Sequence, residues 1–145
     1  MKIVLKNRYF EEVGLKVLES VMKIKFTANT SYWLAKIYDK IKTEAKYYFD
    51  AKNRCADECA LRYEEDGEER EGDKVIRTWK KGDIVLDGRM VVFADQERFN
   101  KEVETLMDIE IDLEIRKFKI ILKDEPNITP KNMRILLPFI ENIAA

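Results

Sequence analysis

The sequence predicts a single α+β domain over residues 1–145, in which a long central helix packs with an opening helix, a small antiparallel β-meander and a short C-terminal helix. Two observations support this class. Residues 30–63 contain neither Gly nor Pro and repeat apolar side chains at helical spacing. Residues 109–122 alternate apolar and charged side chains, as a half-buried strand does.

The long helix is predicted from a stripe of side chains that fall on one helical face. These are Leu34, Ile37, Tyr38, Ile41, Ala45, Tyr48, Cys55, Ala56, Cys59 and Tyr63. The stripe is made of large residues before Lys52 and mostly of Cys and Ala beyond it, so the first half is predicted to form core. Thr30 or Ser31 can cap the start, and Gly67 marks the latest end. An unbroken helix would be about 50 Å long in a globule about 35–40 Å across, so the helix either bends near residues 49–54 or projects.

The chain opens with a predicted strand and helix. Residues 3–5 are apolar and flanked by Lys, as in a short strand, and Asn7 is the expected N-cap of the helix that follows. Residues 22–26 then form an extended connector to the long helix. The apolar face of the opening helix consists of Phe10, Val13, Val17, Leu18 and Val21.

An acidic segment follows the long helix. Residues 64–73 hold seven carboxylates, one Arg and two Gly. Because this composition cannot bury apolar surface, we expect a mobile loop. The β-prone runs at 75–79, 84–86 and 90–93 then predict the meander, with Asp87-Gly88 as a hairpin turn.

The last third of the chain is predicted to be helix, strand and helix. Asp95 caps a helix whose inward side chains are Phe99, Val103, Leu106 and Met107. In the strand, the apolar phase slips by one residue after Arg116-Lys117, which predicts a β-bulge there. Thr129-Pro130 begins the last helix, with Thr as N-cap, and Pro138 kinks or ends it.

Composition restricts the location and the partners. The chain has 145 residues, of which 46% are hydrophobic and 10% aromatic, as expected for one folded domain. Its formal net charge of -1 gives no global attraction to nucleic acid or to an anionic membrane. No apolar run approaches the ~20 residues that span a bilayer, and the first apolar run is too short for a signal peptide. We therefore expect an intracellular protein without a membrane partner.

Catalytic and metal-binding motifs are missing from the sequence. The chain has no His and lacks a nucleophile triad, a phosphate-binding loop and a dinucleotide fingerprint. Cys55 and Cys59 lie one helical turn apart, which suits neither a disulfide framework nor a four-ligand zinc site, so we interpret them as buried thiols. Glu110, Asp112 and Glu114 are interpreted as the solvated face of a strand. No catalytic residue, cofactor or metal is expected.

Aromatic side chains beside cationic ones are the better candidates for function. A helical projection places Tyr32 and Tyr47 on the back of the long helix, and Trp33 on its flank. The neighbouring cations are Lys36, Lys40 and Arg54. Such a face can bind a protein partner, stack on nucleotide bases, or form a second layer of core, and the sequence leaves these three interpretations open.

Two further candidates lie beyond Lys52. The small side chains of Cys55, Ala56, Cys59 and Ala60 would let another helix approach closely, which predicts a homo-oligomer formed through the far half of the long helix up to Tyr63. Trp79, next to two lysines at a turn, is a further exposed aromatic candidate.

The order of these features resembles that of a family of short phage and prophage proteins of unknown function. The resemblance covers nearly the whole chain by pattern, and it includes no catalytic signature. Only residues 74–93 look more elaborate than the variable loop of that family. The resembling segments are Ile24-Lys25-Phe26, Tyr32-Trp33-Leu34-Ala35-Lys36-Ile37, Glu97-Arg98-Phe99-Asn100-Lys101-Glu102 with Leu106, Ile109-Glu110-Ile111, and Ile128-Thr129-Pro130 before Leu136 and Phe139.

The resemblance implies a phage-encoded protein and transfers no active site. We therefore predict a non-enzymatic protein that acts by protein–protein contact in the host cytoplasm or on the virion, as a structural accessory or as a binder of a host factor such as a defence component. The alternative is a nucleotide or nucleic-acid binder, including a sponge for a small molecule of host defence signalling. A third alternative is an enzyme that uses carboxylates.

Overall fold

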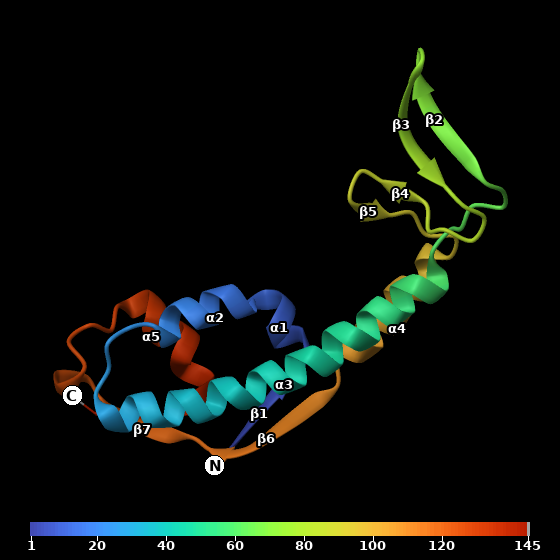
Figure 1. The fold of residues 1–145 in the computed structure, drawn as a ribbon. Helices are drawn as coiled ribbons and strands as arrows, with labels where there is room; N and C mark the ends of the chain where they lie inside the picture. Colours follow the sequence, from blue (N-terminus) through green and yellow to red (C-terminus); the bar gives the residue numbers. More distant parts are fainter. Residues whose placement is uncertain (145) are drawn as a thin grey trace. The chain divides into compact units, whose positions relative to one another are not determined.

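The computed structural model describes residues 1–144, with side chains described through Glu141. The fold is α+β, and the chain divides into two compact units, Met1–Phe49 with Leu106–Ala145 (unit 1) and Asp50–Thr105 (unit 2). Both divisions fall inside helices, the first in α3 (Ala28–Cys59) and the second in α4 (Gln96–Met107) (Figure 1). No described helix is long and apolar enough to cross a membrane.

The long helix α3 is one continuous helix of 32 residues. It begins before Thr30, and the prediction of Thr30 or Ser31 as N-cap was wrong. The hydroxyl of Thr27 accepts a hydrogen bond from the Thr30 amide at 3.4 Å. The buried carboxylate of Glu125 in turn accepts from the Thr27 amide at 3.1 Å and from the Thr27 hydroxyl. A carboxylate at a helix start is favoured because the first amides there lack helical partners.

The core of unit 1 packs around the first part of α3, as predicted. Leu34, Ile37, Ile41, Ala45 and Tyr48 are at most 2% exposed. They share one hydrophobic cluster with side chains from the strands and short helices of unit 1. These elements are β1 (Lys2–Lys6), α1 (Arg8–Glu12), α2 (Leu15–Met22), β6 (Glu110–Arg116), β7 (Phe118–Ile121), α5 (Pro130–Leu136) and the 3₁₀ turn η2 (Leu137–Phe139).

The opening helix differs from its prediction. Gly14 adopts a φ of 81°, which breaks the segment into α1 and α2 and rotates the later residues, so that Val17 is 43% exposed. Asn7 precedes α1 but makes no capping hydrogen bond. Its side-chain amide instead donates to the carbonyl of Leu106 at 2.9 Å.

The strands of unit 1 form two pairs. β1 and β6 are antiparallel, and a salt bridge joins Lys2 to Asp112 across them at 3.5 Å. The register shift lies within β6, where Glu114 has a φ of 60°, so the bulge predicted at residues 116–117 was misplaced. The apolar phase slips at residues 116–117 because the chain there leaves the β1–β6 pair. The next strand, β7, runs parallel to β8 (Ile140–Ala144), a strand that the sequence did not indicate.

The helix signals in the last third of the chain are confirmed. Asp95 caps α4 by accepting from the Arg98 amide at 3.0 Å. Thr129 caps α5 by accepting from the Asn132 amide at 3.2 Å. The helix α5 ends directly before the 3₁₀ turn η2, which contains Pro138. A second short 3₁₀ turn, η1 (Leu122–Asp124), follows β7.

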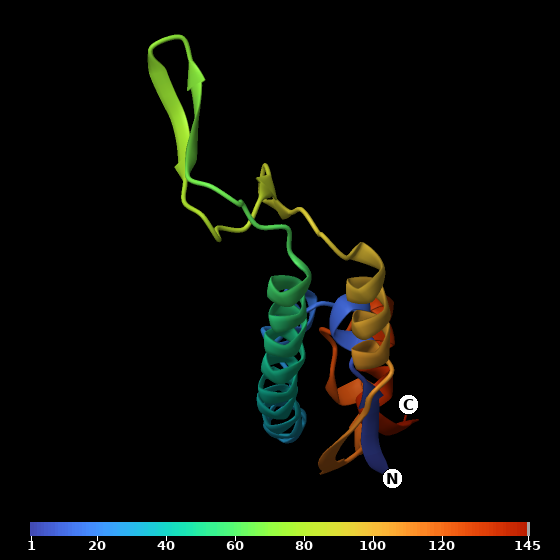
Figure 2. The same ribbon diagram turned by 90° about the vertical axis from the view of Figure 1, so that its right-hand side faces the viewer.

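Unit 2 consists of the last turns of α3, most of α4 and two hairpins (Figures 1 and 2). The first hairpin pairs β2 (Gly67–Glu71) with β3 (Lys74–Trp79), so residues 67–71 are a strand where the sequence predicts a loop. The second pairs β4 (Leu86–Asp87) with β5 (Met90–Val91). Its turn residues include Gly88, with a φ of 62°, as a tight hairpin requires. The strands therefore form separate pairs in place of the predicted meander.

Candidate functional site

The back of α3 in unit 1 is exposed. Tyr32 and Tyr47 are 57% and 64% exposed, so their interpretation as a second layer of core was wrong. Trp33 is half-buried against the core of unit 1. The Lys36 ammonium lies 5.5 Å from the ring centre of Tyr32 and 5.3 Å from that of Trp33, within cation–π range. The structure therefore brings three of the predicted residues together.

Two other predicted residues of that face, Lys40 and Tyr47, lie further along α3 in unit 1. Lys40 is exposed one helical turn beyond Lys36. Tyr47 follows about 22 Å along the helix from Tyr32, at the rise of a regular helix. Arg54 is exposed and belongs to unit 2. Beyond the cluster of Tyr32, Trp33 and Lys36, the predicted residues of this face are therefore single exposed side chains spread along the helix.

The two cysteines are buried free thiols, as predicted. Cys55 donates to an oxygen of Glu102 on α4 at 2.8 Å. Burial, followed by the hydrogen bonds to Glu102 and Cys59, raises the pKa of the Cys55 thiol to about 12. α4 of the same chain thus covers this part of α3. Association of two copies through this half of the long helix stays a prediction.

Glu102 is held from its other side by Arg98. The guanidinium of Arg98 donates to the second oxygen of Glu102 at 3.2 Å and to Glu58 at 3.0 Å. Hydrogen bonds from Cys55 and Arg98 lower the pKa of the Glu102 carboxyl, so it is ionised at neutral pH. Glu102 was not among the site residues predicted from the sequence, which does not connect it with the cysteines.

Beyond α3, an extended segment at residues 60–63 carries the hairpins of unit 2. Leu61 donates to the carbonyl of Val92 at 2.8 Å and accepts from the amide of Val85 at 2.8 Å. Tyr63 exchanges two backbone hydrogen bonds with residues 82–83, each 2.9 Å long. The segment is therefore hydrogen-bonded through its backbone to residues 82–85 and to Val92, and these bonds fix the position of Tyr63.

Tyr63 and Trp79 stack at the base of the β2–β3 hairpin. Their ring centres are 4.6 Å apart and their planes differ by 12°. The guanidinium of Arg77 lies 5.9 Å from the ring of Trp79. These residues border an open groove of about 500 Å³, so the structure unites two aromatic candidates that the sequence placed separately. The groove is lined by Arg62, Tyr63, Arg77, Thr78, Trp79, Gly82, Asp83, Ile84 and Leu86.

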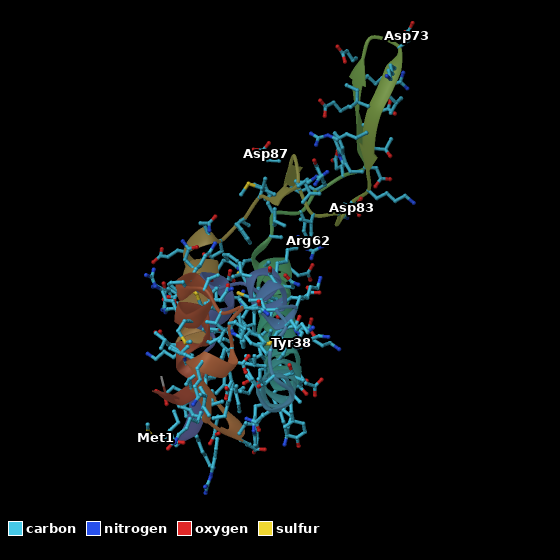
Figure 3. All side chains as sticks on the ribbon, turned by 90° about the vertical axis from the view of Figure 1, so that its left-hand side faces the viewer. Met1, Tyr38, Arg62, Asp73, Asp83 and Asp87 are labelled. Atoms are coloured by element: carbon cyan, nitrogen blue, oxygen red, sulfur yellow. The ribbon has the colours of Figure 1, made fainter. Side chains whose placement is uncertain are left out.

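The rest of the hairpin lies outside any core. Every residue of β2 and β3 is exposed except Gly67 and Trp79, which are half-buried. Val75 and Ile76 are 41% and 50% exposed. Figure 3 shows Asp73 at the tip of this hairpin, with side chains projecting from both of its faces. Among the described residues, no further strand pairs with β2 or β3.

Val75 and Ile76 were not among the functional candidates predicted from the sequence. Two adjacent apolar residues in a strand point to opposite faces. The run Lys74-Val75-Ile76-Arg77 therefore lacks the alternation that would give the strand one buried face. That lack of alternation is the signal that could have identified an exposed hairpin.

No protein-family model, curated protein or solved structure matches the chain.

Gly67→Ala tests whether the stack fixes the hairpin. A Cβ at Gly67 would lie 2.6 Å from the indole nitrogen of Trp79, so we expect a loss of about 1–3 kcal/mol in the free energy of unfolding. In a Trp79→Ala background the clash is gone, and the same change is expected to have little effect. Urea denaturation followed by circular dichroism measures the free energy of unfolding in both backgrounds. An equal loss in the two backgrounds would contradict the packing account.

Proposed function

We propose that this chain is a non-enzymatic protein, encoded by a phage or prophage, that acts by binding another protein through its β2–β3 hairpin. One observation carries the proposal: the hairpin is ordered outside any core and exposes Val75 and Ile76. The sequence resemblance supports the phage origin and a site of action in the host cytoplasm or on the virion. The partner is either a phage structural component or a host factor.

A free hairpin of this kind favours a partner on energetic grounds. A two-stranded sheet without a hydrophobic face is only marginally stable in water. Its outer edges also present unpaired backbone amides and carbonyls, which another strand can pair with. A partner that adds a strand, or covers Val75 and Ile76, would bury apolar area worth about 25 cal/mol per Å².

The charges of β2 indicate what kind of partner strand suits its edge. β2 carries Glu68, Glu69 and Glu71, with Arg70 as its single cation. Arg70 is paired with Glu68, and Glu69 is paired with Arg77 of β3 at 2.6 Å. The edge of β2 is therefore acidic, and it favours a basic strand on the partner.

Substitution of Ile76 by Lys tests the hairpin as the binding surface. Because Ile76 is exposed, Ile76→Lys should leave the thermal midpoint almost unchanged and still lower capture of the partner by at least about tenfold, since an apolar anchor becomes an unpaired charge. Capture is measured by quantitative mass spectrometry on affinity-purified protein from phage-infected host cells.

Val17→Lys is the matched control. Val17 is 43% exposed on α2 in unit 1, so this variant gains the same charge on a different surface and should retain capture. Loss of the same proteins in both variants, or in neither, would contradict the proposed surface. A mass above that of the monomer by light scattering, lost only in Ile76→Lys, would identify a second copy as the partner.

A second candidate function is nucleotide or nucleic-acid binding, including capture of a small signalling molecule of host defence. The observation that favours it is the cluster of the exposed Tyr32 and Lys36 with the half-buried Trp33, in which a cation stands beside two rings. Bases stack on such rings while phosphates pair with the cation. Lys40, one turn further on, extends the cationic surface.

Lys36→Ala separates this candidate from the first. If the cluster binds a nucleotide, the affinity for a fluorescent oligonucleotide or cyclic dinucleotide should fall steeply with salt, and the slope should decrease by about one in Lys36→Ala. Fluorescence anisotropy over a salt series measures it. Salt-independent binding, or a Lys36→Ala slope equal to that of the unmodified chain, would exclude this function for the cluster.

A further inference from the structure

Three metal-ligating side chains converge between α3 and α4 within unit 2. The thiols of Cys55 and Cys59 and a carboxylate oxygen of Glu102 all lie within 4.8 Å of one another. Both thiols are buried, whereas the side chain of Glu102 is 45% exposed. The cluster therefore has a closed side made of sulfur and an open side that solvent reaches.

We propose that Cys55, Cys59 and Glu102 form a zinc-binding site with one coordination position left to a solvent ligand. This site is independent of the hairpin surface proposed above. It also departs from the sequence interpretation, in which the two cysteines suit no four-ligand zinc site. The third ligand comes from a residue 43 positions beyond Cys59, so the spacing of the cysteines could not indicate it.

The distances are close to those that zinc requires. Zinc lies about 2.3 Å from a thiolate sulfur and about 2.1 Å from a carboxylate oxygen, so tetrahedral ligand atoms are about 3.6–3.8 Å apart. The Cys55 sulfur and the Glu102 oxygen are 2.8 Å apart, and the remaining separations are below 4.8 Å. The distance between the two atoms of each ligand pair therefore has to change by about 1 Å, and rotation of the side chains can supply this change.

The surrounding structure holds the ligands in place. Cys55 and Cys59 are four residues apart on a regular helix, so their side chains share one face. Arg98 binds one oxygen of Glu102 at 3.2 Å and leaves the other oxygen directed at Cys55. A hydrogen-bonding partner of this kind orients a ligand and strengthens metal binding by about 10–100-fold in other zinc sites.

The donor set selects the class of metal. Thiolate sulfur is a soft ligand that favours zinc and disfavours magnesium and calcium, which prefer sites made of oxygen. Three protein ligands with an open fourth position are typical of zinc sites that retain a water. The cluster therefore suits zinc, and cobalt(II) can serve as its spectroscopic substitute.

The test is a cobalt(II) titration of the reduced, chelator-treated full chain. We expect one equivalent of cobalt to produce a thiolate-to-metal charge-transfer band, which one equivalent of zinc then removes. Cys59→Ser should weaken the band and lower the affinity by about 100-fold, and Glu102→Gln by at least about tenfold. Asp57→Asn, which removes a carboxylate between the two cysteines on the exposed side of α3, should change neither value.

Circular dichroism of each apo variant shows whether it is folded. Glu102 is partly exposed, so Glu102→Gln should keep the fold even if loss of a buried thiol does not. The proposal is overturned if no charge-transfer band appears, if the band persists at full intensity in Cys59→Ser, or if folded Glu102→Gln binds cobalt as tightly as the unmodified chain. Native mass spectrometry with zinc should show one ion per chain.

Discussion

Burial of one face of α3 determines where the other elements of unit 1 lie. The large side chains of this face, from Leu34 to Tyr48, are almost completely removed from water. Each of the surrounding strands and short helices contributes its own apolar residues to the same cluster. Since none of these elements could cover its apolar face alone, the helix serves as the common surface on which they pack.

The same helix supports a different arrangement in unit 2, where its stripe consists of small side chains. Cys55 and Cys59 allow α4 to pack closely and bring Glu102 to the thiols. Beyond Cys59 the chain becomes extended, and its order depends mainly on backbone hydrogen bonds and on the stack of Tyr63 with Trp79. Residues 64–74 contain no apolar side chain, and the β2–β3 hairpin is exposed along almost its whole length.

Local signals in the sequence predicted the parts of the fold that local physics determines. Helical spacing identified the buried stripe of α3, and Asp95 and Thr129 were correct as caps because a cap acts on amides two or three residues away. The failures depend on distant partners. The start of α3 is fixed by Glu125, 98 residues from Thr27, and the phase slip at β7 arises from its pairing with β8. The contact of Glu102 with the cysteines was missed for the same reason, because the two lie far apart in the sequence.

In the part of the chain that the structure describes, the β2–β3 hairpin is held at its base, while the face of α3 in unit 1 is held by a complete core. Amide hydrogen exchange of the free chain, followed by mass spectrometry, tests this difference most directly, because exchange reports the free energy of local opening. We expect residues 67–79 to exchange at least about a hundredfold faster than residues 34–48. Equal protection of the two segments would contradict it.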